Sequence, residues 1–462
     1  MAAPLRRLPA RGLQSLTRLS EHSGTTLGER SRRLLRDAGH LFGGTTFSGL
    51  LGLASFLLIA RSLGPDAFGA LVLVTSFGTA VTRLCGFQSW QAIIRFAADA
   101  QAKRTDAEVA AIFRLGLLVD VGAAALAATL TWLGAGAAAR VFDWSATVEA
   151  SVPLYAIAVL FTVTGAPTAA LRLYRRFDLI ALQQTVSAAL RLAIVTAVYV
   201  SAPTFESYLI AWIVSHVAQH LLLAAFAARV LRAQGLLAPG VRRGARLRDV
   251  STRVVWRYLA ITNADGVVRV LRELDSQIVA LFVDEAAAGI LRVGRQIAVF
   301  AGRLVDAFFE AIYPQLAQLA ALRQWPEFGA LVRHASLRVG LLATLPLAGF
   351  VLVGAPLVDL VFGAGYEDAY PVTCILLFGV VVWGFTQAYA PALMSLGAVG
   401  RSLLIHAATS IVYVFALIAL VQEYAAQGAA WATVLFNVLW GVLTISVFRA
   451  SVPAERTSRP TS

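Results

Sequence analysis

The apolar runs of this chain are the feature that most limits its fold. Runs long enough to cross a bilayer, about 20 residues for a helix, follow one another along almost the whole 462-residue sequence. Hydrophobic residues make up 58% of the chain and charged residues only 14%, whereas soluble domains carry about 25% charged residues. Because a backbone in lipid must satisfy its own hydrogen bonds, the sequence predicts an all-α polytopic membrane protein.

The positions of the basic residues divide these spans and orient them. A strongly basic linker at residues 229–253 separates six predicted spans from another six. We therefore expect about twelve transmembrane helices, with an N-terminal six-helix bundle over 39–235 and a C-terminal six-helix bundle over 236–450. Arg also dominates alternate loops and both termini. This pattern places a basic N-terminal extension, 1–38, and a tail, 451–462, in the cytoplasm.

The formal net charge of +13 suits a nucleic-acid-binding protein, but the distribution of that charge does not. The Arg residues follow the loops of a membrane protein and do not gather on one basic face outside it. We therefore expect membrane lipid, and no nucleic acid, among the partners. The two cysteines, Cys85 and Cys374, lie in apolar stretches without metal-binding spacing, so we interpret them as packing residues and expect no metal.

The stretch 256–316 is apolar enough to cross the bilayer twice, with a break at 283–289, yet it is rich in charged residues. A charged side chain at bilayer depth costs at least about 2.5 kcal/mol, so such residues normally face a wet cavity or one another. Two sets follow helical periodicity: Asp265, Arg269, Arg272 and Ser276, and then Arg292, Arg295, Arg303, Asp306 and Glu310. We interpret this hairpin as the polar wall of a pathway through the membrane.

Each half of the chain begins with a similar hairpin. Residues 57–74 and 278–295 share the order apolar helix, short acidic turn, Gly, next helix. Parallel repeats related by an axis along the membrane normal are a known transporter design. The repeat favours a transporter built from two related halves.

Four segments, taken in order, carry a resemblance to a known family: ARSLGPDAFGALVL (60–73), RELDSQIVALFVDEAAAGILRVGR (272–295), AIYPQLAQL (311–319) and DLVFGAGYEDAYPV (359–372). Over about residues 40–450 the sequence resembles the polysaccharide-biosynthesis exporters, the O-antigen-type flippases of the multidrug/oligosaccharidyl-lipid/polysaccharide (MOP) superfamily. The resemblance implies two six-helix bundles around a central cavity in the bacterial inner membrane. It also implies alternating access for an undecaprenyl-pyrophosphate-linked glycan, with the polymerase and glycosyltransferases of the same pathway as partners.

Arg suits such a substrate because its planar, always charged guanidinium binds phosphate oxygens bidentately. We predict that the pyrophosphate and glycan contact seven arginines of the predicted spans: Arg83, Arg191, Arg269, Arg272, Arg292, Arg295 and Arg303. Several polar residues lie near Arg191 in sequence and offer partners for sugar hydroxyls: Gln183, Gln184, Ser187, His216, Gln219 and His220.

Pairing with acids is the alternative role for some of these arginines. Arg269 and Arg272 each have an acid one helical turn away, so structural pairing is as well supported as substrate contact. Arg292 and Arg295 have no acid one turn away within their helix, which favours substrate contact. Arg83 lies near a helix end, where a long cationic side chain can also extend to the interface.

Two carboxylates are candidates for proton or sodium coupling, because acids inside helix bundles commonly serve as relays. They are Asp275 and Asp120. Asp275 has an alternative role as the partner of Arg272, and Arg303 has Asp306 three residues further on. The sequence does not separate these alternatives.

The leading prediction is a flippase that makes and breaks no covalent bond, is not an enzyme and uses no cofactor. One alternative is a drug/cation antiporter of the same superfamily, which would favour carboxylates and aromatics around a cationic substrate. Another is a membrane glycosyltransferase or polysaccharide polymerase. Such an enzyme would usually carry a large external loop, whereas the predicted external loops here are all short.

Overall fold

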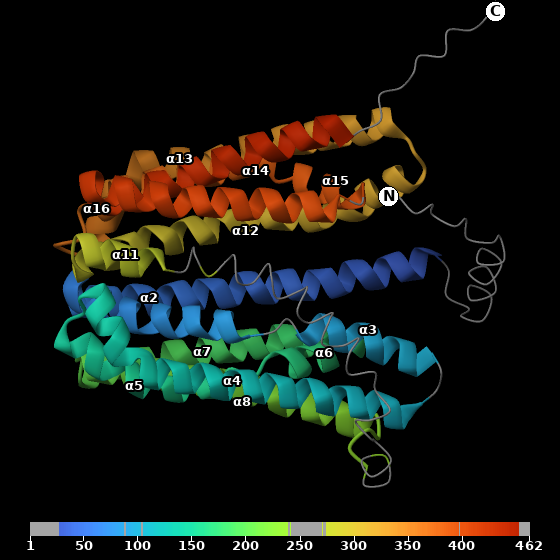
Figure 1. The fold of residues 1–462 in the computed structure, drawn as a ribbon, viewed down its shortest axis with the longest axis horizontal. Coiled ribbons are helices and arrows are strands. Elements are labelled where there is room, and N and C mark those ends of the chain that lie inside the picture. Colours follow the sequence, from blue (N-terminus) through green and yellow to red (C-terminus); the bar gives the residue numbers. More distant parts are fainter. Residues whose placement is uncertain are drawn as a thin grey trace, which may run out of the picture.

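The computed structural model describes residues 27–86, 89–102, 105–238, 241, 270, 274–396 and 398–451, and all regular secondary structure in these ranges is helical. The first group of helices is α2 (Leu27–Cys85), α3 (Ser89–Ala102), α4 (Asp106–Phe142), α5 (Ala146–Leu160), α6 (Gly165–Leu173), α7 (Phe177–Ser201) and α8 (Phe205–Ala233). The second group is α11 (Asp275–Phe282), α12 (Glu285–Ala321), α13 (Trp325–Phe362), α14 (Ala369–Thr386), α15 (Tyr389–Ser395) and α16 (Val399–Ser451). Figure 1 shows the two groups as two lobes lying side by side.

Eight helical stretches in the described ranges are long and apolar enough to cross a membrane, so the chain is a multi-pass membrane protein. Two helices each contain two spans, since α2 turns at Gly64 and α16 turns at Ala425, both with positive φ. With these divisions, and with α5–α6 and α14–α15 counted as one span each, the helices are roughly consistent with the predicted twelve. Most of the predicted seventh span lies outside the described residues.

The basic stretch 95–114 is mostly helical. Helix α3 continues to Ala102, and α4 already begins at Asp106. The sequence TDAE marks the start of α4, because Thr105 donates its hydroxyl to Glu108 at 2.9 Å in the spacing of a helix-capping box. The apolar stretch after Ser145 is not one continuous helix, because residues 161–164 separate α5 from α6.

Several spans start at a polar N-cap. Ser145 Oγ accepts a hydrogen bond from Val148 N, Thr204 Oγ1 accepts one from Ser207 N, and Asp284 Oδ1 accepts one from Ala287 N. Such residues satisfy backbone N–H groups that the helix leaves unpaired, and carboxylates are also favoured at this end of the helix dipole. These helix starts lie at one end of the molecule (Figure 1), here called the acidic end. Six acids lie in or beside the helix starts and turns of this end: Asp66, Asp143, Glu206, Asp284, Glu285 and Glu367.

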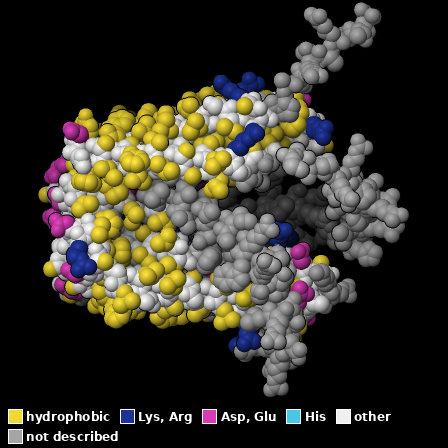
Figure 2. Space-filling model, in the orientation of Figure 1, with side chains coloured by type: hydrophobic (Ala, Val, Ile, Leu, Met, Phe, Trp, Pro, Cys, Tyr) yellow, Lys and Arg dark blue, Asp and Glu magenta, His cyan; other side chains and the backbone are white. Residues whose placement is uncertain are grey.

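Arginines mark the opposite end, here called the basic end: Arg114, Arg172, Arg232, Arg333, Arg401 and Arg449. Figure 2 shows more acids at one end, more basic residues at the other and a largely hydrophobic surface between them. Helix α2 begins and α16 ends at the basic end (Figure 1). A charge asymmetry of this kind is how helical membrane proteins set their orientation.

The two lobes meet closely at the acidic end, where the two repeated hairpin turns pack against each other. A Cβ added at Gly69 would lie 1.7 Å from the carbonyl oxygen of Glu285, and one added at Gly289 would lie 2.8 Å from that of Pro65. Only glycine allows backbones to approach so closely. The sequence repeat therefore places two equivalent glycines at one interface.

Two hydrogen bonds extend this contact between lobes. Tyr366, which is fully buried, donates its hydroxyl to the carbonyl of Ala60 at 2.9 Å, and Arg61 donates to the carbonyl of Leu360 at 2.6 Å. Toward the basic end the described residues of the two lobes lie apart, with a hollow visible between them (Figure 2). In the described part of the chain, the lobes are thus in contact at the acidic end and apart at the basic end.

Candidate functional site

Gln277 of α11 joins the two lobes at the acidic side of the hollow. Its side chain is fully buried, and its amide nitrogen donates to the carbonyl of Leu73 and to Ser76 Oγ, both at 2.9 Å. Its amide oxygen accepts from Trp144 Nε1, also at 2.9 Å. A buried amide with all these partners in the opposite lobe stabilises the contact between the lobes, because separating them would leave its polar atoms without these hydrogen-bond partners. The sequence signal was a lone Gln beside Asp275 in an apolar helix.

Asp275 lies next to Gln277 and forms an ion pair with Arg295 of α12. The carboxylate side chain is 1% exposed and that of Arg295 is 22% exposed. Tyr413 of α16 places its hydroxyl 3.5 Å from Asp275 Oδ2. The sequence offered Arg272 as the partner of Asp275, but Arg272 lies outside the described residues. Arg295, on the next helix, is the observed partner.

Arg191 of α7 occupies a buried site in the first lobe. One guanidinium nitrogen donates to Gln219 Oε1 at 3.2 Å, and the guanidinium carbon lies 5.1 Å from the ring centre of Trp212. Its Nε–H is buried and has no hydrogen-bond partner in the described part of the chain. The described partners of Arg191 are therefore neutral, and the cation keeps an unused donor.

Arg191 lies in the first lobe and Arg292 in α12 of the second, and the charges of both act on one residue between them. This residue is Tyr155 of α5, which is 3% exposed. Two of the predicted substrate arginines thus act electrostatically on the same buried ring from opposite lobes. Neutral amides and hydroxyls surround the Arg191 side, because Gln183 donates to Ser187 Oγ and to the carbonyl of Gln219.

The two histidines of α8 lie beside this cluster. His216 Nε2 is 3.1 Å from Thr162 Oγ1, and His220 Nδ1 is 2.8 Å from the carbonyl oxygen of His216. The two rings are 4.4 Å apart between centres. No group of three or more metal-ligating side chains occurs in the described ranges. The histidines are hydrogen-bonded residues in the wall of the cluster.

Arg303 of α12 contacts the first lobe and not Asp306. It donates to the carbonyl of Thr45 at 3.1 Å and lies so close to Gly49 that an added Cβ would meet its guanidinium. It also lines a cavity of about 250 Å³ whose other walls are mostly apolar. Asp306 instead accepts from Gln387 at 3.4 Å. The predicted pairing of Arg303 with Asp306 is wrong, because the long side chain of Arg303 reaches α2.

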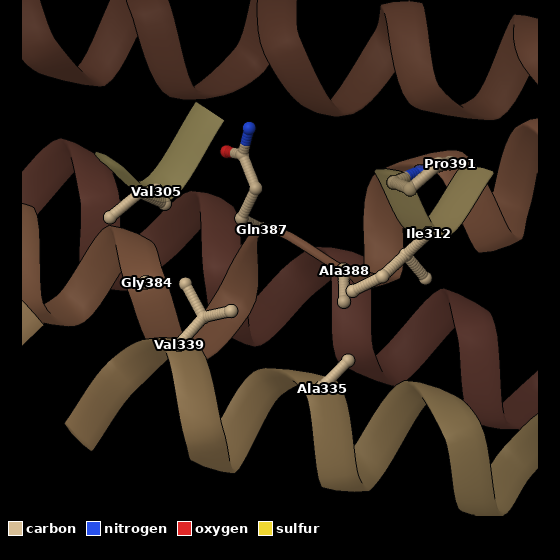
Figure 3. Close-up of a pocket in the computed structure, with 8 residues that line it drawn as sticks. All are labelled: Val305, Ile312, Ala335, Val339, Gly384, Gln387, Ala388 and Pro391. Carbon is tan, nitrogen blue, oxygen red and sulfur yellow. The ribbon is translucent and has the colours of Figure 1, made fainter. Parts of the chain in front are cut away.

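A second pocket is too small for any glycan. It lies where α14 breaks before α15, and Figure 3 shows Gln387 as the one polar side chain among the eight that it labels. Its volume is about 10 Å³, which is room for about one water molecule. The buried Oε1 of Gln387 has no partner among the described residues. This pocket is a packing defect at a helix break.

The other predicted residues have different outcomes. Arg83 is exposed in the last turn of α2, whereas Arg269 and Arg272 lie outside the described residues. Asp120 is buried in α4 and bonded to Ser89 and to the backbone of Ala166. The described site thus consists of Arg191 and Arg292 at the lobe boundary, with the Asp275–Arg295 pair close by in sequence.

Comparisons with known proteins point in one direction. The family model described as "Polysaccharide biosynthesis protein" matches residues 34–320. The inner membrane protein YghQ of Escherichia coli (strain K12) is 26% identical over 348 residues, which are 73% of this chain and 95% of that protein.

Solved structures of transporters share the fold. An inward-facing multidrug resistance transporter of the MATE family, in the MOP superfamily, aligns with a TM-score of 0.72 at 14% identity, covering 89% of this chain and 96% of that one. The lipid II flippase MurJ, in an inward closed conformation, aligns with a TM-score of 0.70 at 12% identity, covering 88% and 87%.

Proposed function

The chain belongs to the polysaccharide biosynthesis protein family, and on that premise we propose that it flips a polyprenyl-pyrophosphate-linked oligosaccharide across the bacterial inner membrane. The glycan would then be assembled into a surface polysaccharide. The protein makes and breaks no covalent bond in this process. What it supplies is a polar route for the head group while the polyprenyl tail stays in lipid.

One observation carries this proposal: the buried guanidinium of Arg191 bonds to Gln219, lies over Trp212 and keeps an Nε–H without a partner in the described part of the chain. A diphosphate head is an anion with several oxygens, and guanidinium groups bind such oxygens through short, charge-assisted hydrogen bonds. The unused Nε–H of Arg191 offers one of these donors. The amides and hydroxyls of Gln183, Ser187 and Gln219 suit sugar hydroxyls.

The closed acidic end and the hollow at the basic end support alternating access. The head group would enter the hollow at the basic end, which the positive-inside pattern assigns to the cytoplasm together with both termini. Binding to both lobes at once would favour a state in which they approach each other at the basic end. The contacts of Gly69, Gln277 and Tyr366 would then separate, and the head would leave at the acidic end.

Arg295 has a different part in this proposal from the one expected from sequence. Its charge is engaged by Asp275, so we assign phosphate binding first to Arg191 and Arg292. The Asp275–Arg295 pair sits next to the interlobe bond of Gln277 and supports the closed arrangement.

A drug/cation antiporter is the second candidate, because a MATE transporter shares the fold. The electrostatics of the cluster argue against it. Two guanidinium groups at the lobe boundary repel a cationic drug and attract a phosphate. The short loops between the described helices also give no room for the external catalytic domain of a polymerase. The polymerase and glycosyltransferases of the pathway remain proposed partners.

The test uses purified protein in liposomes with a fluorescent polyprenyl-pyrophosphate lipid, whose access to an external quencher reports flipping. We expect R191Q and R292Q each to slow flipping at least tenfold. The matched control is R140Q, since Arg140 is exposed at the far end of α4. Flipping by R191Q and R292Q at the rate of R140Q would overturn the proposal. Transport of a lipophilic cation in its place would favour the antiporter.

A further inference from the structure

The span formed by α5 and α6 is interrupted inside the membrane. Helix α5 ends at Leu160 and α6 begins at Gly165, so residues 161–164 are not helical within a 28-residue span. A break at membrane depth exposes backbone groups that lipid cannot satisfy. Transporters place such breaks where half-helix ends meet ligands or ions.

The carboxylate of Asp120, on α4, satisfies the start of α6. Its Oδ2 accepts from Ala166 N and its Oδ1 from Ser89 Oγ, both at 2.5 Å, and the N–H of Gly165 also points to it. Asp120 is 7% exposed. A Cβ at Gly165 would lie 1.7 Å from Ser89 Oγ and 2.7 Å from Asp120 Oδ1. Residue 165 is therefore glycine because the carboxylate approaches the backbone itself.

The partners of this buried carboxylate are all neutral in the described part of the chain. Each of the three helices that meet at Asp120 carries an arginine six residues from the point of contact. Arg95 on α3 is six residues from Ser89, Arg114 on α4 is six from Asp120, and Arg172 on α6 is six from Ala166. Six residues correspond to about 9 Å of helix rise, and all three lie toward the basic end. The described partners of Asp120 include no other titratable side chain.

The arrangement allows Asp120 to take up a proton without breaking an ion pair. The anion is stabilised only by hydrogen-bond donors and by the N-terminus of α6. A neutral carboxyl group makes weaker bonds to the same donors, since charge-assisted hydrogen bonds are about twice as strong. Protonation would therefore weaken the attachment of α6 to α4.

The other side of the break touches the candidate site. Thr162, three residues before Gly165, lies 3.1 Å from His216. The ring of His216 lies 6.4 Å from that of Tyr155, between centres. Tyr155 is the residue on which the charges of Arg191 and Arg292 both act. One hydrogen bond thus connects the break to the wall of the proposed phosphate site.

We propose that Asp120 is the proton-binding residue that couples transport to a pH gradient, and that it acts by holding or releasing the break between α5 and α6. The inference rests on the proposed function for its role in transport, but proton binding by Asp120 does not. The proton adds to one carboxylate oxygen, which then donates to Ser89 Oγ, while the N–H groups of α6 lose an anionic acceptor. By linkage, substrate and proton change each other's affinity by the same factor.

The first experiment needs no substrate. Infrared difference spectra of the full-length protein in lipid nanodiscs, recorded between acidic and neutral pH, report the C=O band of a buried carboxyl that gains a proton. We expect a band that disappears in D120N and shifts in S89A. The matched control D143N changes an exposed acid at the C-cap of the same helix and should keep the band. A band that persists in D120N would overturn the proposal.

The second experiment measures flipping in liposomes with and without a pH gradient. We expect the gradient to accelerate flipping several-fold in the wild type and in D143N and to have no effect on flipping by D120N. In D120E the acceleration should be smaller than in the wild type. Acceleration of D120N equal to that of D143N would overturn the coupling role. If the wild type flips no lipid at all, the proposed function fails, and the infrared result still decides whether Asp120 binds the proton.

Discussion

Each lobe holds a buried aspartate and a largely buried arginine, Asp120 with Arg191 in the first and Asp275 with Arg295 in the second, and the two lobes arrange them in opposite ways. In the second lobe Asp275 and Arg295 form an ion pair. In the first lobe Asp120 bonds to a hydroxyl and to backbone N–H groups, whereas Arg191 bonds to an amide and lies over an indole ring. The paired charges are committed to structure. The separated charges remain available, one for a proton and the other for an anion.

The largest effect should come from breaking the pair in the second lobe. Removing one partner of a buried ion pair leaves an uncompensated charge and costs about 3–5 kcal/mol. We expect R295Q to lower the thermal stability of the purified protein strongly. The double variant D275N/R295Q should recover most of the loss, because no unpaired charge remains. Additive losses in the double variant would contradict the pairing.

Replacing the arginine of the first lobe, Arg191, by Gln should leave the stability of the protein nearly unchanged and reduce its affinity for the lipid diphosphate. R191Q removes a buried cation that has no acid partner in the described part, so its unfolding temperature should stay close to that of R140Q. A hydrogen bond to a charged group contributes about 1.5–3 kcal/mol, which corresponds to roughly a tenfold loss or more in affinity for undecaprenyl pyrophosphate. R191K should retain only part of the wild-type affinity. A strong loss of stability in R191Q would erase the contrast between the lobes.

The contact between the lobes should respond to added volume. G289V places side-chain atoms against the backbone of the opposite turn, where overpacking costs about 1–3 kcal/mol. We expect the acidic end to open more often, measured as faster labelling by a water-soluble maleimide of a cysteine introduced at Ala60. The control G302V lies on the same helix, at a glycine with no neighbour within 4 Å. Equal labelling rates in G289V and G302V would refute this closure.

A smaller effect concerns the hydrogen bond of Tyr366. Burial raises the pKa of its hydroxyl well above the ordinary value, so the group is a neutral donor throughout the physiological range. Y366F removes its bond to the carbonyl of Ala60 and should destabilise closure by about 1 kcal/mol. The same cysteine-labelling measurement should show a modest increase. No increase would mean that the glycine contact alone holds this end.

The smallest effect should come from Glu367, at the exposed edge of the acidic end. Backbone N–H groups, including that of Gly365, lower the pKa of its carboxyl. A carboxyl group whose pKa is lower in the folded state stabilises the fold at pH values above its unfolded-state pKa. This stabilisation is lost as the pH falls through the folded-state pKa. We expect E367Q to flatten slightly the fall in unfolding temperature between pH 6 and pH 3 and to leave flipping unchanged, because full exposure screens the effect.

The sequence by itself determined the class of the protein, the approximate number of spans and the repeated hairpins. These follow from properties that each segment carries alone. An apolar run of sufficient length must be helical in lipid, and a Gly–Pro pair or an acidic turn ends a helix without help from the rest of the chain. The resemblance to polysaccharide exporters added the family, which the match over residues 34–320 confirmed.

Only the tertiary structure decided which charges meet. Asp275 pairs with Arg295 and not with a residue of its own helix, and Arg303 reaches α2 and not Asp306. Arg191 and Arg292, which act on the same tyrosine, are 101 positions apart in the sequence. Asp120 reaches a break 45 residues away, at a TVTG segment whose Thr, Val and Gly were a weak local signal. The physical reason is that electrostatic and hydrogen-bond energies depend on distance in space, which the packing of helices sets and sequence separation does not.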